Sequence, residues 1–311
     1  MAPIRILHHQ SVSQNFRNLI DWRQSGNGRP SLFLRVPPGQ PQAAFLTSNP
    51  LEIPGLHPRM NVSSTTLFYD LHRFELSDMI ELGGTLRQLH LQADSMEEAA
   101  SAIVHYLYEH FVDPITGEKN CALARFFKTH RFAELEPGLQ DVARRASGNS
   151  PALNDETRCL TLLATAGMRP EWNQRGTSAG HKAIPLVTEE VVRQAPMVAQ
   201  LIQGFGLDIS QVVRPDVNLM LDADQQNYNV FHVAEAPGSA FVPAQDFVRE
   251  CGIRSVLGFG GLFSSGDLFA VILFSRVYIP RETAELFRTL ALGIKLALLP
   301  FVRGQIFAKE A

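Results

Sequence analysis

From about residue 70 onward, apolar residues recur at spacings of three and four in several segments, which is the pattern of amphipathic helices. Ser95 starts the best marked of them, because a Ser-Met-Glu-Glu capping box precedes apolar residues that share one face as far as Phe111. Thr188 caps another helix, which Pro196 should kink or divide. The predicted helices are Ser77–Leu89, Ser95–Phe111, Thr188–Ile202 and Pro280–Phe301, with shorter stretches at Phe132–Ala146 and Pro243–Cys251.

Short apolar runs between these helices predict β-strands. The clearest feature is a hairpin in which two such runs are joined by Ser264-Ser265-Gly266-Asp267, a tight turn with glycine where positive φ is favoured. The predicted strands are Cys121–Phe127, Arg158–Thr165, His181–Val187, Tyr228–Val233, Ile253–Phe263 and Leu268–Val277. This order of elements predicts an α+β fold, an antiparallel sheet with its helices on one face, rather than a doubly wound α/β fold.

The last predicted helix carries a seam of apolar residues at spacings of three and four, similar to that of a coiled coil. Its central members are Phe287, Leu290, Ile294 and Ala297. Further leucines lie outside the seam, so this helix must bury more than one face. It is either a dimer helix or a wholly internal helix.

The first 66 residues differ from the rest of the chain. They hold eight of the 19 prolines, including a breaker at Pro37–Pro41, and six arginines against two acidic residues. We interpret residues 1–66 as a Pro/Arg-rich extension that packs on the main domain, reaches from it or binds a partner. The remaining chain divides into a main domain at 67–302 and a C-terminal tail at 303–311.

Charge and hydrophobicity exclude several classes of function. The net charge of −3 and the absence of a long basic run give no electrostatic footprint for nucleic acid. The longest apolar stretch in the second half, Leu268–Phe274, is far shorter than a membrane span. The N-terminus lacks the apolar core of a secretory signal, so we expect a cytoplasmic protein.

Three short patterns suggest chemistry that their context does not support. Gly176-Thr177-Ser178-Ala179-Gly180 matches the nucleophile elbow of hydrolases, but no strand precedes it and no helix follows. Gly258-Phe259-Gly260-Gly261 begins like a dinucleotide fingerprint, yet it lies in a hairpin strand, where glycine relieves crowding or forms a bulge. Cys121, Cys159 and Cys251 form no CxxC pair, which argues against a disulfide framework or a zinc site. We therefore expect no catalytic or metal site.

Longer stretches of the second half resemble a GAF-type sensory region, as found ahead of bacterial histidine kinases, PAS modules and nucleotide cyclases. The resemblance covers roughly residues 70–302 and is strongest from residue 181 onward. It is carried by His181–Leu186, Tyr228–Val233, Arg254–Gly261, Gly266–Ser275 and Arg281–Phe287. It implies a six-stranded antiparallel sheet of the GAF/PAS type, a ligand pocket between the sheet and its cross-over segments, and terminal helices that pair in a homodimer.

By analogy with that family, the pocket would be walled by Trp172, His181, Phe231 and His232, with Arg254 as an anion anchor. If haem were the ligand, His181 or His232 would be the axial candidates. No cysteine is followed by histidine, so the bilin-attaching pattern is missing, and the signature of cyclic-nucleotide GAF domains is absent as well. No kinase, cyclase or phosphatase motif follows residue 302, so we expect either a stand-alone regulator or the sensory part of a longer one.

The sequence thus favours a cytoplasmic sensor that binds a small molecule, with haem as one possibility, and signals through a dimer helix to a partner such as a histidine kinase. One alternative is a thiol-dependent oxidoreductase similar to free methionine sulfoxide reductases, in which Cys121 and Cys159 would meet on neighbouring strands. A second alternative is an interaction module whose pocket is filled. A cavity larger than a water molecule would favour the sensor over this module.

Overall fold

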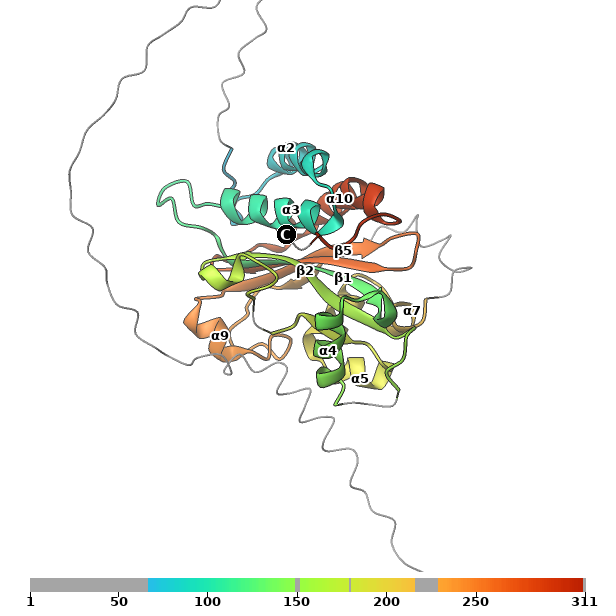
Figure 1. The fold of residues 1–311 in the computed structure, drawn as a ribbon. Coiled ribbons are helices and arrows are strands. Elements are labelled where there is room, and N and C mark those ends of the chain that lie inside the picture. Colours follow the sequence, from blue (N-terminus) through green and yellow to red (C-terminus); the bar gives the residue numbers. More distant parts are fainter. Residues whose placement is uncertain (1–66, 149–151, 179, 216–228, 310–311) are drawn as a thin grey trace, which may run out of the picture. The chain divides into compact units, whose positions relative to one another are not determined.

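The computed structural model describes residues 67–148, 152–178, 180–215 and 229–309, and the extension predicted at 1–66 lies outside them. Its centre is a six-stranded antiparallel sheet in the order β3-β2-β1-β6-β5-β4 (Figure 1). The strands are β1 (Cys121–Arg131), β2 (Arg158–Gly167), β3 (Ala183–Pro185), β4 (Phe231–Val233), β5 (Ser255–Leu262) and β6 (Leu268–Ser275). The α+β class and the six antiparallel strands are confirmed.

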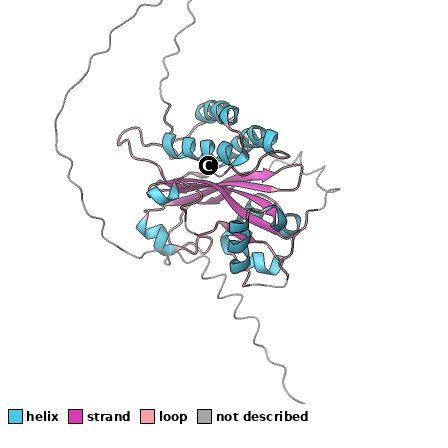
Figure 2. Cartoon of the chain, in the orientation of Figure 1, coloured by secondary structure: helices cyan, strands magenta, loops and turns pink. Residues whose placement is uncertain are grey.

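Helices cover both faces of this sheet (Figures 1 and 2). One face carries α2 (Leu76–Leu86), α3 (Met96–His110) and α10 (Arg281–Leu298). The other carries short helices, namely α4 (Pro137–Ala146), α5 (Glu189–Arg193), α6 (Pro196–Gly204), α7 (Ile209–Val213) and α9 (Gln245–Glu250). The prediction that all helices lie on one face was therefore wrong. Strands β5 and β6 are buried along their whole length, so both of their faces need cover.

The capping residues and helix breaks predicted from the sequence are found in the structure at the expected helix ends. The Ser95 hydroxyl accepts a hydrogen bond of 3.2 Å from the backbone N–H of Glu98 and caps α3. Pro196 begins a new helix, so the segment after Thr188 is divided into α5 and α6 as expected. The edge strands β3 and β4 are shorter than predicted, because each pairs with its neighbour over three residues only.

The β5–β6 hairpin is confirmed together with its glycines. Gly266 has φ of +77°, the left-handed conformation that this turn requires. Gly260 pairs with Ala270, and a Cβ atom there would lie 2.9 Å from the Ala270 Cα and overlap the Phe269 carbonyl oxygen. Close approach of two strands therefore explains Gly260 in the sequence that resembled a nucleotide motif.

Aromatic rings fill the core between the sheet and the long helices. Phe287 of α10 lies 5.0 Å from Phe259 of β5 and 5.2 Å from Phe74, measured between ring centroids. Phe111, just after α3, lies 5.9 Å from the same ring. These tilted and edge-on contacts fix α10 on the sheet through its apolar face.

The segment predicted as a C-terminal tail is tied to the start of α3. The backbone N–H groups of Met96 and Glu97 donate to the carbonyls of Gln305 and Ile306. Arg175, in the loop after β2, forms ion pairs with Glu97 at 2.7 Å and with Glu136 at 2.9 Å. The Arg175 guanidinium also stacks over the Phe307 ring at 5.2 Å. One arginine therefore links this loop, the start of α3 and the C-terminal segment.

Within the described ranges, no helix combines the length and the apolar character that a membrane crossing requires.

Candidate functional site

A cavity of about 80 Å³ lies between the sheet and its short-helix layer. The sheet contributes Phe127, Leu160, Ile184, Ile272 and Phe274 to its wall. The opposite side is formed by residues of α6 and of the segment leading into α9, chiefly Met197, Val198, Leu201, Val242 and Phe247. A cavity of only about 10 to 15 Å³ suffices for one water molecule, whereas one of about 150 Å³ admits benzene. The space is therefore larger than a packing defect and suits a small organic molecule.

Among the described residues that line this cavity, Arg125 and His181 are the ionisable ones and the others are apolar. Arg125 comes from the middle of β1, two residues before Phe127, so strand alternation points both side chains to the cavity face. The antiparallel register sets Arg125 opposite Ile272 of β6, another wall residue. A guanidinium group therefore lies in the apolar wall of the cavity.

Arg125 is 2% exposed, and one Nη atom donates a 3.0 Å hydrogen bond to the hydroxyl of Ser178. Burial lowers the pKa of the guanidinium to about 10, so it is still cationic at neutral pH. Ser178 is fully buried, and its oxygen holds the guanidinium in position without supplying a charge. Ser178 is the serine of the apparent nucleophile elbow, and its burial against Arg125 gives that motif a structural role.

His181 sits at the end of the same loop in an unusual backbone conformation. Its φ is +53°, and Gly180 before it also has positive φ, at +72°. A histidine in this region is strained, and such strain concentrates at ligand sites. Burial and the neighbouring Arg125 charge lower the pKa of the imidazole to about 4, so it is neutral at pH 7. The pair thus consists of one cation and one neutral hydrogen-bonding ring.

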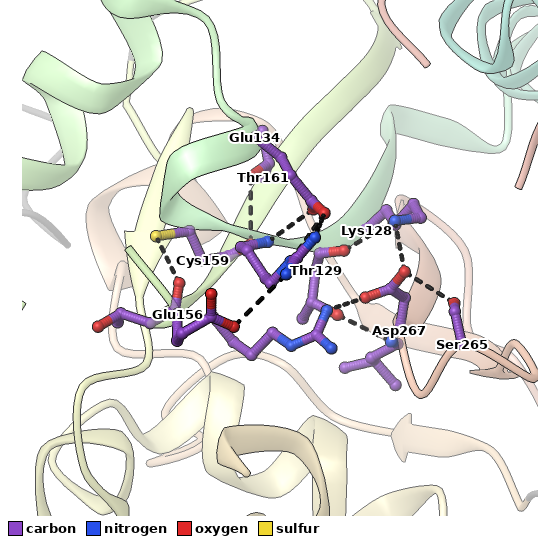
Figure 3. Close-up of polar contacts among 12 residues, drawn as sticks. Lys128, Thr129, Glu134, Glu156, Cys159, Thr161, Ser265 and Asp267 are labelled. Carbon is purple, nitrogen blue, oxygen red and sulfur yellow. Dashed lines mark hydrogen bonds and ion pairs between the residues drawn. The ribbon is translucent and has the colours of Figure 1, made fainter. Parts of the chain in front are cut away.

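A second polar cluster, at the tip of the β5–β6 hairpin, is structural (Figure 3). Asp267 accepts from Lys128 at 3.0 Å and from Ser265 at 2.8 Å, and its other carboxylate oxygen pairs with Arg158. The hydroxyl of Thr129 accepts from the backbone N–H of Leu268 at 2.9 Å. These bonds fasten the hairpin turn to β1 and β2.

Of the residues predicted from the family resemblance, His181 lines the cavity. Trp172 is buried behind the wall, where its ring meets the ring of Phe247 edge-on at 5.8 Å. Phe231 lies in the core of the same layer, and a Cβ atom at Gly204 of α6 would be 3.1 Å from its Cα. Trp172 and Phe231 support the cavity without facing it.

The other two predicted residues lie away from the cavity. His232 of β4 alternates with Phe231 and Val233, which belong to the core of the cavity side. Its Nε2 atom donates to the Ile279 carbonyl at 3.0 Å. Arg254 is exposed just before β5 and is not a wall residue. Arg125, rather than Arg254, is the arginine of the cavity.

Sequence reasoning missed Arg125 and assigned no role to Ser178. One signal was available, since Arg125 interrupts the otherwise apolar first half of a strand that was predicted to be buried. A charged residue at such a position is rarely buried unless it has a partner or a function. Its connection to Ser178, 53 residues later, was not visible in the sequence.

Haem does not fit this site. The cavity of about 80 Å³ is smaller than the roughly 150 Å³ of a cavity that admits benzene, and a porphyrin is several times larger than benzene. The second axial candidate, His232, bonds to Ile279 outside the cavity wall. Among the described residues, no group of three or more His, Cys, Asp and Glu side chains is arranged to hold a metal ion.

The cysteines do not form the pair that a thiol oxidoreductase requires. Cys159 pairs with His130, at the opposite end of β1 from Cys121. Both thiols are buried, and burial raises the pKa of each to about 12. Two distant, protonated thiols support neither thiolate attack nor resolution by a second thiol.

The four predicted dimer-seam residues pack inside their own chain. Phe287, Leu290, Ile294 and Ala297 are each at most 1% exposed. The apolar residues that α10 and its continuation leave exposed are Leu292, Leu296 and Leu299, which belong to a different stripe. With Ile80 of α2, Leu292 and Leu296 line a groove of about 180 Å³ between the two helices.

No protein-family model matches the chain, and no curated protein matches it. Among solved structures, it is similar to the GAF domain of a phosphoenolpyruvate-protein phosphotransferase from Coxiella burnetii. The two share 14% sequence identity, with 71% of this chain and 91% of that one covered and a TM-score of 0.34. At a TM-score below 0.5, this likeness carries no argument about fold, ligand or activity.

Proposed function

We propose that this chain is a GAF-like sensory or regulatory module that takes up a small molecule between its sheet and its short-helix layer. The observation that carries the proposal is the apolar cavity with Arg125 in its wall. Protein cores are normally filled to crystal-like density, and a buried charge is costly. Both features at one place are typical of binding sites, which combine apolar walls with a few fixed polar groups.

The same features favour this function over the alternatives. An interaction module with a filled core would have no such cavity, and the arrangement of Cys121 and Cys159 argues against thiol chemistry. The cavity side is closed by short helices and connecting segments, which open at lower free energy than a central sheet. Ligand uptake would therefore shift this layer, and a partner such as a histidine kinase would read the change.

A binding screen on the full chain tests the proposal. Native mass spectrometry of the purified protein and a thermal-shift screen of small organic molecules would identify binders. Val198→Phe adds a ring to the cavity wall and should abolish binding. Val191→Phe is the matched control, since Val191 packs against the same core but does not line the cavity. Binding that survives Val198→Phe, or a complete absence of binders, would refute the proposal.

A homodimer through α10 is part of this proposal. If it forms, its contacts would come from the exposed Leu292 and Leu296 rather than from the buried seam. Sedimentation should then show a dimer that Leu292→Gln and Leu296→Gln together convert to a monomer. A monomeric wild-type chain, or a dimer unaffected by these changes, would contradict it.

A further inference from the structure

We infer that the turn at residues 174–178 couples the cavity to the C-terminal segment 303–309, so that ligand uptake loosens this segment from the start of α3. This inference rests on the proposed function and goes further, because it names the part of the chain at which a partner would detect an occupied cavity. The turn joins the two places, since one of its side chains bonds to the cavity wall and another holds the C-terminal segment.

The turn is held together by its own hydrogen bonds. The backbone N–H of Ser178 donates to the carbonyl of Gln174 at 3.0 Å, which closes a single helical turn. The carbonyl of Gly176 accepts a bond of 2.6 Å from Nζ of Lys182, just before β3. Because the turn is closed in this way, we expect Arg175 and Ser178 to move together.

At the cavity end, the hydroxyl of Ser178 accepts a 3.0 Å hydrogen bond from Arg125, which is itself a residue of the cavity wall. Both side chains are at most 2% exposed. A cavity of about 80 Å³ has little spare room, so a molecule that enters it displaces residues of the wall. If Arg125 moves, Ser178 either follows it or loses a buried hydrogen bond, which is costly. The turn therefore responds to a change at the wall.

At its other end, the turn holds the C-terminal segment through Arg175. The Arg175 guanidinium pairs with Glu97 at 2.7 Å and stacks over the Phe307 ring at 5.2 Å. The Glu97 carboxylate also accepts the backbone N–H of Ala308 at 3.0 Å. Glu97 lies in the first turn of α3, which covers the face of the sheet opposite the cavity (Figure 1). The turn is thus bonded to residues on both faces of the sheet.

The C-terminal segment has a bound and a released state that the turn can bias. In the bound state, its carbonyls accept from the backbone N–H groups of Met96 and Glu97, which have no partner within the helix. In the released state, water takes over these bonds and Phe307 becomes exposed. Release breaks few contacts, so it needs less free energy than opening of the sheet. A displacement of Arg175 away from Glu97 and Phe307 favours release.

Hydrogen exchange on the full chain tests the link from the turn to the segment. Ser178→Ala removes the bond to the cavity wall and leaves Arg175 in place. The reporter amides are the backbone N–H groups of Met96, Glu97 and Ala308. Their exchange should become about three- to tenfold faster, because loss of one hydrogen bond to a charged group changes an equilibrium by about tenfold or more, and the segment receives part of that change.

Ser255→Ala is the matched control. Ser255 is another buried serine of the sheet, and its hydroxyl bonds to Ala234 and Ile279 rather than to the turn. This variant should leave the reporter amides at the wild-type rate. If Ser255→Ala speeds their exchange as much as Ser178→Ala does, the effect is a general loss of stability and the inference is wrong.

The link from the cavity to the segment is tested by filling the cavity. Val198→Phe adds a ring to the wall and takes the place of an occupant, whereas Val191→Phe adds the same ring to the core beside it. Val198→Phe should speed exchange of the reporter amides, and Val191→Phe should not. Equal rates in these two variants would overturn the inference.

Phe307→Ala tests the coupling in the reverse direction and replaces Ser178→Ala if that variant does not fold. Coupling between two sites is reciprocal, so release of the C-terminal segment should disturb the cavity wall. The Nε–H NMR signal of Arg125 should therefore shift in Phe307→Ala, which leaves the charge of Arg175 unchanged. An Arg125 signal at its wild-type position would contradict the coupling.

The outcomes separate this inference from the proposed function. If small molecules bind the wild type, and neither Ser178→Ala nor Val198→Phe changes the reporter amides, the proposed function stands and the coupling is refuted. If no molecule binds, the proposed function fails and the inference fails with it, even where Ser178→Ala speeds exchange.

Discussion

Replacement of Gly260 by alanine tests the packing of the sheet most directly. Gly260 lies in β5, and the strand opposite it, β6, is hydrogen-bonded on both sides, to β5 and to β1. The added Cβ atom would lie 2.9 Å from the Ala270 Cα and 3.0 Å from the Phe269 carbonyl carbon, and would overlap the Phe269 oxygen. These are backbone atoms of a paired strand, so no side-chain rotation can relieve the clash.

The cost can be estimated from this geometry. Overpacking a core typically costs about 1 to 3 kcal/mol, and more where the surroundings cannot yield. Because two neighbouring strands must separate, we expect Gly260→Ala to lower the free energy of unfolding by about 3 kcal/mol or more. For a domain of this size, about 3 kcal/mol corresponds to a fall in Tm of roughly 6 to 12 °C.

Gly84→Ala is the matched control. Gly84 lies within α2, and a Cβ atom there meets nothing within 4 Å. Alanine should raise the free energy of unfolding by about 0.5 to 1 kcal/mol, because it is the better helix former. Urea unfolding followed by circular dichroism should therefore move the two midpoints in opposite directions. A Gly260→Ala variant as stable as wild type would refute the close strand approach.

Three further predictions concern buried charges. The pKa of His181 is about 4 in the folded chain and 6.5 ordinarily, so the unfolded chain binds the proton first as the pH falls. The free energy of unfolding should drop by about 3 kcal/mol between pH 6.5 and 4, and His181→Gln should flatten this fall in pH-dependent urea titrations. Asp267→Asn leaves Lys128 and Arg158 buried without their carboxylate and should cost about 3 to 5 kcal/mol in the same assay, and a loss below about 1 kcal/mol would contradict this. Arg175→Met should speed hydrogen exchange at the backbone amides of Met96, Glu97 and Ala308, which bond the C-terminal segment to the start of α3, and unchanged protection there would show that the arginine does not hold this segment.

The sequence by itself determined the elements whose causes are local. The Ser95 cap, the break at Pro196 and the glycine of the β5–β6 turn act within a few residues, so each was predicted at its observed position. Apolar patterning also identified an antiparallel α+β sheet, since strand and helix periods differ. These features need no knowledge of what lies across the fold.

The candidate site was decided by tertiary structure alone. Alternation along β1 shows that Arg125 and Phe127 share a face, but only the pairing with β6 and the cover of α6 turn that face into a cavity. The hydrogen bond from Arg125 to Ser178 joins residues that are far apart in the chain. His181 is equally distant from Arg125 in the sequence, yet both residues line the same cavity.

The last helix shows the same limit. Its period identified a buried stripe through Phe287 and Ile294, but not the surface that buries it. Burial depends on what the rest of the chain brings against a side chain, and the spacing of apolar residues is the same for a sheet as for a second copy. In the tertiary structure, this stripe packs within its own chain, with Phe287 against Phe259 of the sheet. The cavity lies on the other face of the sheet.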